Sequence, residues 1–148
     1  MGGSVMIISV ASDHGGFALK EKVKEHLEKR GFEVKDFGCY DQGSCDYPDF
    51  GRPAAKAVAD GECDLGVLIC TTGIGMSMVA NKIPGVRAAL CSDSLSASLT
   101  RQHNNANVLV MGAGIVGPDL AMSILDTFMD TPFSEAERHI RRVNKIEG

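Results

Sequence analysis

The stretch Leu65-Gly-Val-Leu-Ile-Cys70-Thr71-Thr72-Gly73-Ile74-Gly75-Met76-Ser77 decides the fold. Its first six residues form an apolar run with the length and branching of a buried parallel strand. A Thr/Gly loop follows, and then residues that can begin a helix. In an open α/β sheet, ligands bind beyond the carboxyl ends of such strands. Cys70 is therefore expected at the mouth of the sheet.

The loop after this strand has the chemistry of an anion site. Its glycines leave backbone N–H groups open, and the N-terminus of the following helix adds a favourable field. The same field favours the thiolate form of a cysteine, which is the better base and nucleophile. The alternative is a structural loop with a buried, inert Cys70, since free cysteine is among the most buried residue types. This stretch alone leaves both interpretations open.

Length and composition predict one ordinary domain. The chain has 148 residues, 44% of them hydrophobic and 23% charged, with a net charge of -4, which suits a single core. Residues 1–5 are expected to be a short N-terminal tail, and residues 6–148 a single domain. The start has neither a basic segment nor a long apolar core, so no signal peptide is predicted.

The same totals exclude several partners. No apolar run reaches the ~18 residues that a membrane helix needs, so no membrane partner is expected. The acidic balance and the lack of Trp argue against nucleic acid. The five cysteines contain no Cys-x-x-Cys pair and no zinc-type spacing with His. A reducing cytoplasm is the expected location, with no metal and no other cofactor.

Strand and helix patterns alternate along the chain, which indicates a three-layer, Rossmann-like α/β domain with a mostly parallel sheet of about five strands. Ser134 and Glu137 form a capping-box pattern for a C-terminal helix. The expected strands are 6–11, 32–37, 65–70, 86–91 and 107–111. The expected helices are 17–30, 52–60, 76–82, 92–102, 117–129 and 134–146.

Polar groups gather at the predicted strand ends and could converge at one edge of the sheet. They are Asp13 and His14, residues 70–75, Ser92 and Asp93, residues 112–114, and His103 and Asn104 from a helix end. Together they supply a thiol, two imidazoles, a carboxylate and backbone donors, which is an acid/base set without metal geometry.

Each of these residues has a structural alternative. Asp13 can simply cap a helix, and His103 can bind a carbonyl at a helix C-terminus. Arg138 and Arg142 share one helix face, which is either a solvated basic face or a fork for a phosphate. The chain has no complete dinucleotide fingerprint, no P-loop and no Gly-x-Ser-x-Gly elbow.

Five motifs in order resemble the family of type B ribose-5-phosphate isomerases, which also holds galactose-6-phosphate isomerase subunits. The resemblance runs from about residue 6 to residue 146. The motifs are Ala11-Ser-Asp13-His14-Gly-Gly16, Asp46-Tyr47-Pro48, Cys70-Thr-Thr-Gly-Ile-Gly75 with Ala80-Asn81-Lys82, Arg101-Gln-His103-Asn104, and Arg138-His139 with Arg142.

The resemblance implies a metal-free isomerase that interconverts ribose 5-phosphate and ribulose 5-phosphate in the pentose phosphate pathway. It implies that Cys70 moves a proton between C1 and C2 through a cis-enediolate. His103 and Asp13 would open the furanose ring. The Thr71–Gly75 loop, including Thr72, Gly73 and Ile74, would hold the sugar and the enediolate.

The resemblance also implies further site residues and an oligomer. Asn104 would lie in the substrate site, and His14, Arg138 and Arg142 would bind the phosphate. Family members are homodimers or homotetramers with sites built between two subunits.

One position departs from the family pattern, because many relatives carry arginine where this chain has Gly114. A missing charge would weaken phosphate binding or widen the substrate range. An isomerase of a six-carbon phosphosugar or a free aldose is therefore the alternative within the enzyme class. A non-catalytic sugar-phosphate binding module and a redox-sensing Cys70 are alternatives outside it.

Overall fold

The computed structural model describes residues 5–148, so the predicted tail lies outside the described residues except for Val5. The five strands are β1 (Ile7–Ser12), β2 (Glu33–Asp36), β3 (Leu65–Cys70), β4 (Ala88–Leu90) and β5 (Val108–Gly112). The helices are the short 3-10 helix η1 (His14–Gly16), α1 (Phe17–Lys29), α2 (Tyr47–Ala59), α3 (Ile74–Asn81), α4 (Ser94–Asn104), α5 (Pro118–Asp130) and α6 (Glu137–Glu147).

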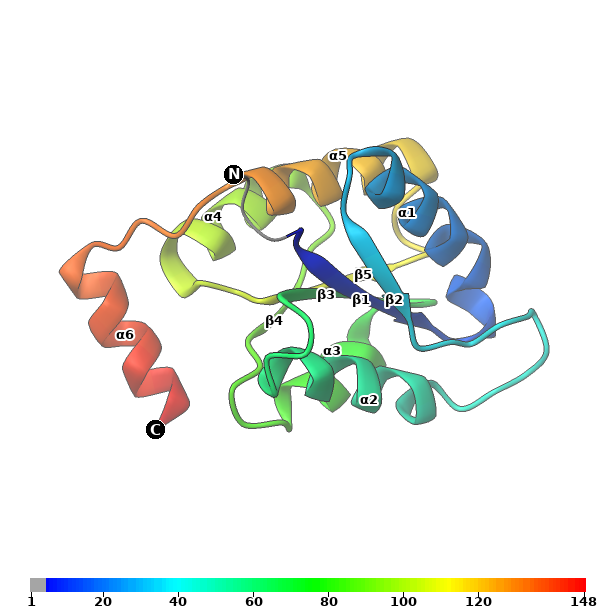
Figure 1. Ribbon diagram of the computed structural model, residues 1–148, viewed down its shortest axis with the longest axis horizontal. Coiled ribbons are helices and arrows are strands. Elements are labelled where there is room, and N and C mark those ends of the chain that lie inside the picture. Colours follow the sequence, from blue (N-terminus) through cyan, green and yellow to red (C-terminus); the bar gives the residue numbers. More distant parts are fainter. Residues whose placement is uncertain (1–4) are drawn as a thin grey trace.

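The five strands form one parallel sheet in the order β2-β1-β3-β5-β4 (Figure 1). The predicted strand 65–70 is confirmed as β3, and it lies at the centre of the sheet. All six of its residues are buried, as its unbroken apolar run requires. From β1 the chain continues to β2, which is one neighbour of β1 in the sheet, and then to β3, which is its other neighbour. The carboxyl ends of β1 and β3 therefore flank a topological switch point, where ligands bind in such folds.

Helices cover both faces of the sheet, which confirms the predicted three-layer α/β architecture (Figure 1). On one face, α1 and α5 bury leucines, isoleucines and Phe128 against the strands, and Ala97 of α4 joins them. On the other face, α2 and α3 bury mostly small residues, including Ala54, Ala55 and Ala80. Small side chains let these two helices lie close to the sheet.

The last helix, α6, stands apart from the layers and packs against α4 (Figure 1). In the figure it lies at the opposite end of the molecule from the long loop that joins β2 to α2. Its final turn is tied back to the sheet, since Glu147 accepts hydrogen bonds from the Arg87 guanidinium and, at 3.3 Å, from the Gly85 amide.

The prediction that the second helix begins at residue 52 is wrong. Helix α2 begins at Tyr47, directly after Asp46. Pro48 falls in its first turn, where a missing N–H costs nothing because the first helical amides have no intrahelical partner. Pro53 then lies inside the helix. Prolines are more common at helix boundaries than inside helices, so the pattern favoured a later start of α2.

The predicted capping box of the last helix is also wrong. Helix α6 starts after Ala136, whose side chain cannot cap it. The Ser134 hydroxyl instead accepts the Ala136 amide at 3.2 Å and bonds to Nδ1 of His139 at 2.6 Å. The Ser134 hydroxyl thus binds the buried His139 ring, whereas the capping-box pattern predicted that it would cap the helix backbone.

Other helix ends follow the sequence closely. Asp93 caps α4 by accepting the Ser96 amide at 2.7 Å, and Gly31 ends the first α-helix with a φ of 93°. Strand β4 is shorter than predicted, spanning three residues at the edge of the sheet. Among residues 5–148, no helix combines the length and apolar content needed to cross a membrane.

Candidate active site

The sulfur of Cys70 lies where β3 ends and the Thr/Gly loop begins. Cys70 is the last residue of the strand, and its Sγ accepts a hydrogen bond from the Gly73 amide at 3.2 Å. Gly73 is also the residue that precedes helix α3, so the thiol faces the positive end of that helix. The amide of the loop and the start of α3 therefore fix the position of the sulfur.

Two glycines of this loop are required by geometry. Gly73 has a φ of 81°, and a Cβ there would lie 2.4 Å from Cδ1 of Leu90. A Cβ on Gly75 would lie 2.6 Å from the Tyr47 ring, which packs directly over it. The Gly75 amide belongs to the first turn of α3 and has no acceptor further back along the helix, so it can donate to a ligand.

An open hollow of about 400 Å³ lies over the loop. Six of the predicted site residues line it, and Gly73 lies buried beneath them. Tyr47 and Met78 line it too, although no role for either residue was predicted from the sequence. Tyr47 belongs to Asp46-Tyr47-Pro48, one of the five motifs shared with the family, and this motif was the signal that could have assigned it to the site. The six predicted residues are Asp13, Cys70, Thr71, Thr72, Ile74 and Gly75.

Asp13 follows β1 and faces the same hollow. Its Oδ1 accepts the Gly16 amide at 2.9 Å, so the capping role considered from the sequence is confirmed. The residue is only 8% exposed, yet it lines the hollow beside Cys70. A carboxylate accepts more than one hydrogen bond, so capping and contact with a ligand are compatible.

His14 is the exposed neighbour of Asp13, and a loop fixes its ring. The Cys45 amide donates to Nδ1 of His14 at 3.3 Å. A ring nitrogen that accepts a hydrogen bond carries no proton, so the neutral ring has its proton on Nε2. That N–H is the donor available to a ligand.

The loop that carries Cys45 is anchored by a fully buried lysine. Nζ of Lys20 donates to both oxygens of Asp36, at 2.7 and 2.8 Å, and to the Cys39 carbonyl at 2.6 Å. Asp36 also accepts the Gly38 amide at 2.8 Å. These bonds fix the start of the loop between β2 and α2.

The expectation that His103 and Asn104 meet Cys70 within one chain is wrong. They end helix α4, which starts at the carboxyl edge of the sheet, where the strands end, and returns the chain to the amino edge, where the strands begin. A crossover helix between parallel strands must make this return. Asn104 consequently lines a different hollow from that of Cys70.

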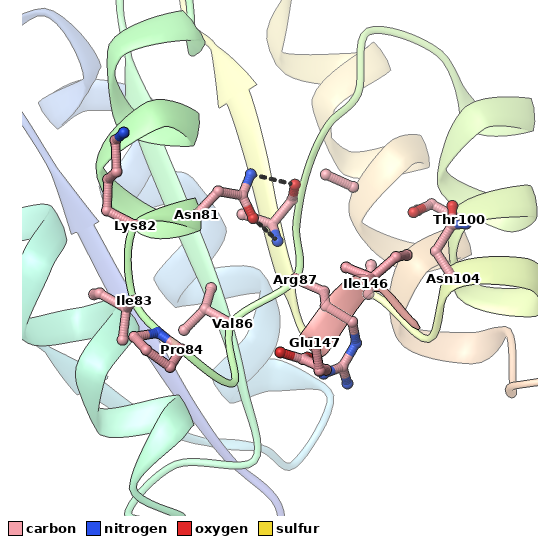
Figure 2. Close-up of a pocket in the computed structure, with 13 residues that line it drawn as sticks. Asn81, Lys82, Ile83, Pro84, Val86, Arg87, Thr100, Asn104, Ile146 and Glu147 are labelled. Atoms are coloured by element: carbon pink, nitrogen blue, oxygen red, sulfur yellow. Dashed lines mark hydrogen bonds and ion pairs between the residues drawn. The ribbon is translucent and has the colours of Figure 1, made fainter. Parts of the chain in front are cut away.

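That second hollow, of about 650 Å³, lies at the amino edge between α3, β4, α4 and the end of α6 (Figure 2). Figure 2 shows Asn81 at its rim, where its side chain bonds to the backbone of β4. Arg87 and Glu147 form an ion pair on another side, beside Ile146. The hollow is larger than the one over Cys70, but the residues that line it include neither a cysteine nor a histidine.

His103 instead joins a cluster with helix α6. The rings of His103 and His139 lie 4.5 Å apart between centroids and are tilted by 36°. His139 is 7% exposed, whereas Arg138 and Arg142 are exposed on the same helix. Burial lowers the pKa of His139, and the nearby His103, Arg138 and Arg142 lower it further.

Three of the other four thiols are poor candidates for a base. Burial raises the pKa of Cys45 and of Cys63, and it raises the pKa of Cys91 to about 11. Thiols with raised pKa values stay protonated at neutral pH and react slowly. Of the five cysteines, Cys70 alone lines the hollow over the Thr/Gly loop, so the geometry agrees with the sequence in singling it out.

Gly114 lies beside the Cys70 loop. Its amide donates to the Thr71 carbonyl at 2.8 Å, and a Cβ built on Gly114 would lie 3.1 Å from that oxygen.

Comparison with known proteins identifies the family. The Ribose/Galactose Isomerase family model matches residues 8–146. The chain belongs to this family. Ribose-5-phosphate isomerase B of Escherichia coli is 46% identical over 139 residues, covering 94% of this chain and 93% of that protein. The structure of Clostridium thermocellum ribose-5-phosphate isomerase B is 51% identical with a TM-score of 0.94, covering 96% of this chain and 95% of that one.

A second kind of relative lies in the same family. Galactose-6-phosphate isomerase subunit LacB of Clostridium acetobutylicum is 39% identical, covering 96% of this chain and 82% of that protein. The resemblance found from the five motifs is confirmed. The prediction of an isomerase, rather than of a non-catalytic binding module, is confirmed as well.

Proposed function

We propose that this protein interconverts D-ribose 5-phosphate and D-ribulose 5-phosphate by metal-free proton transfer through a cis-enediolate. The observation that carries the proposal is the position of Cys70: its Sγ accepts the Gly73 amide and opens into a hollow beside a carboxylate. Relatives whose names specify ribose 5-phosphate support the substrate.

Cys70 acts as the base of the isomerisation. With the sugar in its open form, the thiolate takes the proton from C2, which gives the enediolate, and then returns it to C1. The C2 hydroxyl gives its proton to the former carbonyl oxygen on C1, so the carbonyl moves to C2. Negative charge develops on the former carbonyl oxygen. The Gly75 amide and the Thr72 hydroxyl are donors for that charge, and removing one such donor typically costs on the order of 3 kcal/mol in the barrier.

Opening of the furanose ring precedes this step and needs a separate acid/base pair. Asp13 takes the proton of the C1 hydroxyl while His103 gives a proton to the ring oxygen. Asn104 holds the sugar hydroxyls. His14, through Nε2–H, and Arg138 and Arg142 bind the phosphate, whose binding energy orients the reacting carbons.

These residues lie at opposite edges of one chain, so the complete site requires two copies. One copy supplies Asp13, His14 and the Cys70 loop, and its partner supplies the His103 and α6 residues. Exposed apolar side chains on α3 and α4 fit such contact: Met78 is 63% exposed and Leu95 is 68% exposed. Both helices run from the carboxyl edge to the amino edge, so a two-fold axis that pairs them antiparallel brings the two edges together.

The first experiment measures interconversion of ribose 5-phosphate by NMR in the presence of EDTA. Wild-type turnover that is lost in Cys70→Ala is the expected result, with Cys63→Ala as the matched control because Cys63 is a buried thiol at the other edge of the sheet. In D2O, deuterium should enter the product, as proton exchange through an enediolate requires. Turnover retained in Cys70→Ala would contradict the assignment of the base.

The composite site is tested by mixing two inactive variants. Cys70→Ala and His103→Ala homodimers, once their subunits exchange, should form mixed dimers with one intact site. Random pairing then restores about a quarter of the wild-type activity. Full subunit exchange without any recovery would refute the shared site, while leaving the reaction itself intact.

Six-carbon sugars are a second substrate class, and one observation favours them: Gly114, which lies beside Thr71, has no side chain that could occupy space or carry charge there. The relative named as a galactose-6-phosphate isomerase subunit extends the comparison to six-carbon sugars. Comparing kcat/KM for ribose 5-phosphate, allose 6-phosphate, galactose 6-phosphate and free allose decides between these substrates. A higher kcat/KM for a six-carbon sugar would replace the pentose assignment.

A further inference from the structure

We propose that His139 is a positioning residue that holds the His103 imidazole in place as a neutral stacking partner. The proposal starts from the contact between the two rings, 4.5 Å apart between centroids. It rests on the proposed function, because the role of His103 in opening the sugar ring gives the contact its purpose. His139 lines neither the hollow over Cys70 nor the one at the amino edge, and it is not assigned contact with substrate.

A closed set of bonds fixes the His139 ring on helix α4. The Ser134 amide donates to the Gln102 carbonyl at 3.1 Å, one residue before His103. The Ser134 hydroxyl in turn bonds to Nδ1 of His139 at 2.6 Å. The serine thus links the end of α4 to the ring that packs against His103, and the ring cannot rotate without breaking this bond.

The position of His139 on α6 explains why an imidazole is buried there. His139 and Val143 are one helical turn apart and are the two buried residues of the helix. Val143 supplies ordinary apolar packing, while His139 supplies packing together with a polar nitrogen for Ser134. Apolar anchoring alone would not require histidine.

Burial and, after it, the neighbouring charges lower the pKa of the His139 ring. The groups that face it are His103 from α4 and Arg138 and Arg142 from α6, all cationic when protonated. Two imidazolium rings this close would repel each other, so only one can hold a proton readily. His139 is the buried member of the pair, whereas His103 is exposed and is the ring that can reach a sugar.

The test compares three variants in steady-state kinetics on ribose 5-phosphate. His139→Ala removes the ring contact and should lower kcat about tenfold, with KM changed less than twofold, because a misplaced catalytic group lowers the rate more than the affinity. His139→Phe keeps a neutral ring and should retain kcat within about threefold. Val143→Ala loosens the same helix without touching the ring, so its effect should fall on KM through Arg138 and Arg142.

Equal kcat losses in His139→Ala, His139→Phe and Val143→Ala would reduce His139 to a helix anchor and overturn the proposal. An unchanged kcat in His139→Ala would overturn it as well. Each variant is first compared with wild type by circular dichroism and by its oligomeric state.

A second readout does not depend on activity. Imidazole nitrogen NMR follows the titration of His139 in the intact protein, where its pKa should lie below the ordinary value of 6.5. His103→Asn removes one of the charges that lower this pKa, so the pKa of His139 should rise. An unmoved pKa would show that the two rings are not coupled and would overturn the proposal. A wild-type protein without turnover would overturn the proposed function, whereas this titration would still test the contact.

Discussion

Lys20 offers the most direct test of the energetics of this fold. Its side chain is fully buried, and its ammonium makes three hydrogen bonds, two to Asp36 and one to the Cys39 carbonyl. The Lys20→Met change keeps most of the apolar stem and removes the charge. Asp36, with a side chain only 13% exposed, then loses its main partner.

The expected loss can be bounded from these contacts. Hydrogen bonds to charged groups each contribute roughly 1.5–3 kcal/mol, but burying the ammonium has its own desolvation cost. Removing one partner of a buried ion pair typically costs about 3–5 kcal/mol. Asp36 keeps the Gly38 amide at 2.8 Å and has Lys24 at 3.6 Å. These partners put the loss near the lower end, about 3 kcal/mol of the free energy of unfolding.

Urea unfolding at a fixed protein concentration measures this loss. The Asp36→Asn variant removes the opposite charge, and the double variant completes a thermodynamic cycle whose coupling should be at least about 1.5 kcal/mol. Lys22→Met, an exposed lysine on the same helix, is the matched control and should stay within about 0.5 kcal/mol of wild type. A loss under about 1 kcal/mol for Lys20→Met, or additive single effects, would refute the reasoning.

Three further predictions address the site and the surface. Gly73→Ala places a Cβ 2.4 Å from Leu90 at a position with positive φ, so it should lower the free energy of unfolding by about 1–3 kcal/mol. The change also moves the amide that donates to the Cys70 thiol and should therefore lower kcat. A wild-type kcat would contradict the role of that amide. Gly114→Arg should lower KM for phosphorylated sugars and leave KM for free aldoses unchanged, and equal shifts for both would argue against a phosphate contact. Burial raises the pKa of Asp126, but hydrogen bonds, chiefly from His26, outweigh it, so the folded-state pKa is lowered. The stabilisation is complete above the pKa that Asp126 has in the unfolded chain, and it is lost as pH falls through the lower pKa of the folded state. Asp126→Asn should therefore make Tm fall less steeply with decreasing pH than it does in the wild type. Equal slopes of Tm against pH for the two proteins would contradict this.

The fold was predictable because its central strand is unambiguous. The run 65–70 is apolar on every residue, and only a strand covered on both faces has that pattern in so short a segment. Local residues such as Asp93 and Gly31 set the ends of their helices, and the predicted bounds of α1 and α4 lie within two residues of the observed ones. These signals are local, so a sequence contains them in full.

The errors occurred where distant contacts override local signals. Ser134 is a good cap by pattern, but His139 takes its hydroxyl. Lys20 lies among exposed lysines and glutamates of α1, and nothing in that spacing indicates that it alone is buried. Its partner Asp36 lies sixteen residues further along the chain, at the end of β2.

The candidate site divides in the same way. Asp13 and the Cys70 loop were predictable because each directly follows a parallel strand, and such ends share an edge. His103 ends a crossover helix, so strand-end reasoning assigned it to the wrong edge. A local pattern in one chain carries no signal for the second copy that the proposed site requires.

The side chain of Asn81 has a consequence for the behaviour of the sheet in solution. It donates to the Ala88 carbonyl at 3.0 Å and accepts the Ala88 amide at 2.9 Å, the same pair of bonds that a neighbouring strand would form (Figure 2). Strand β4 is an edge strand, and exposed edges are where folded chains begin to polymerise. One amide from the end of α3 therefore imitates the next strand, and the sheet cannot add a foreign segment at Ala88 without first displacing it.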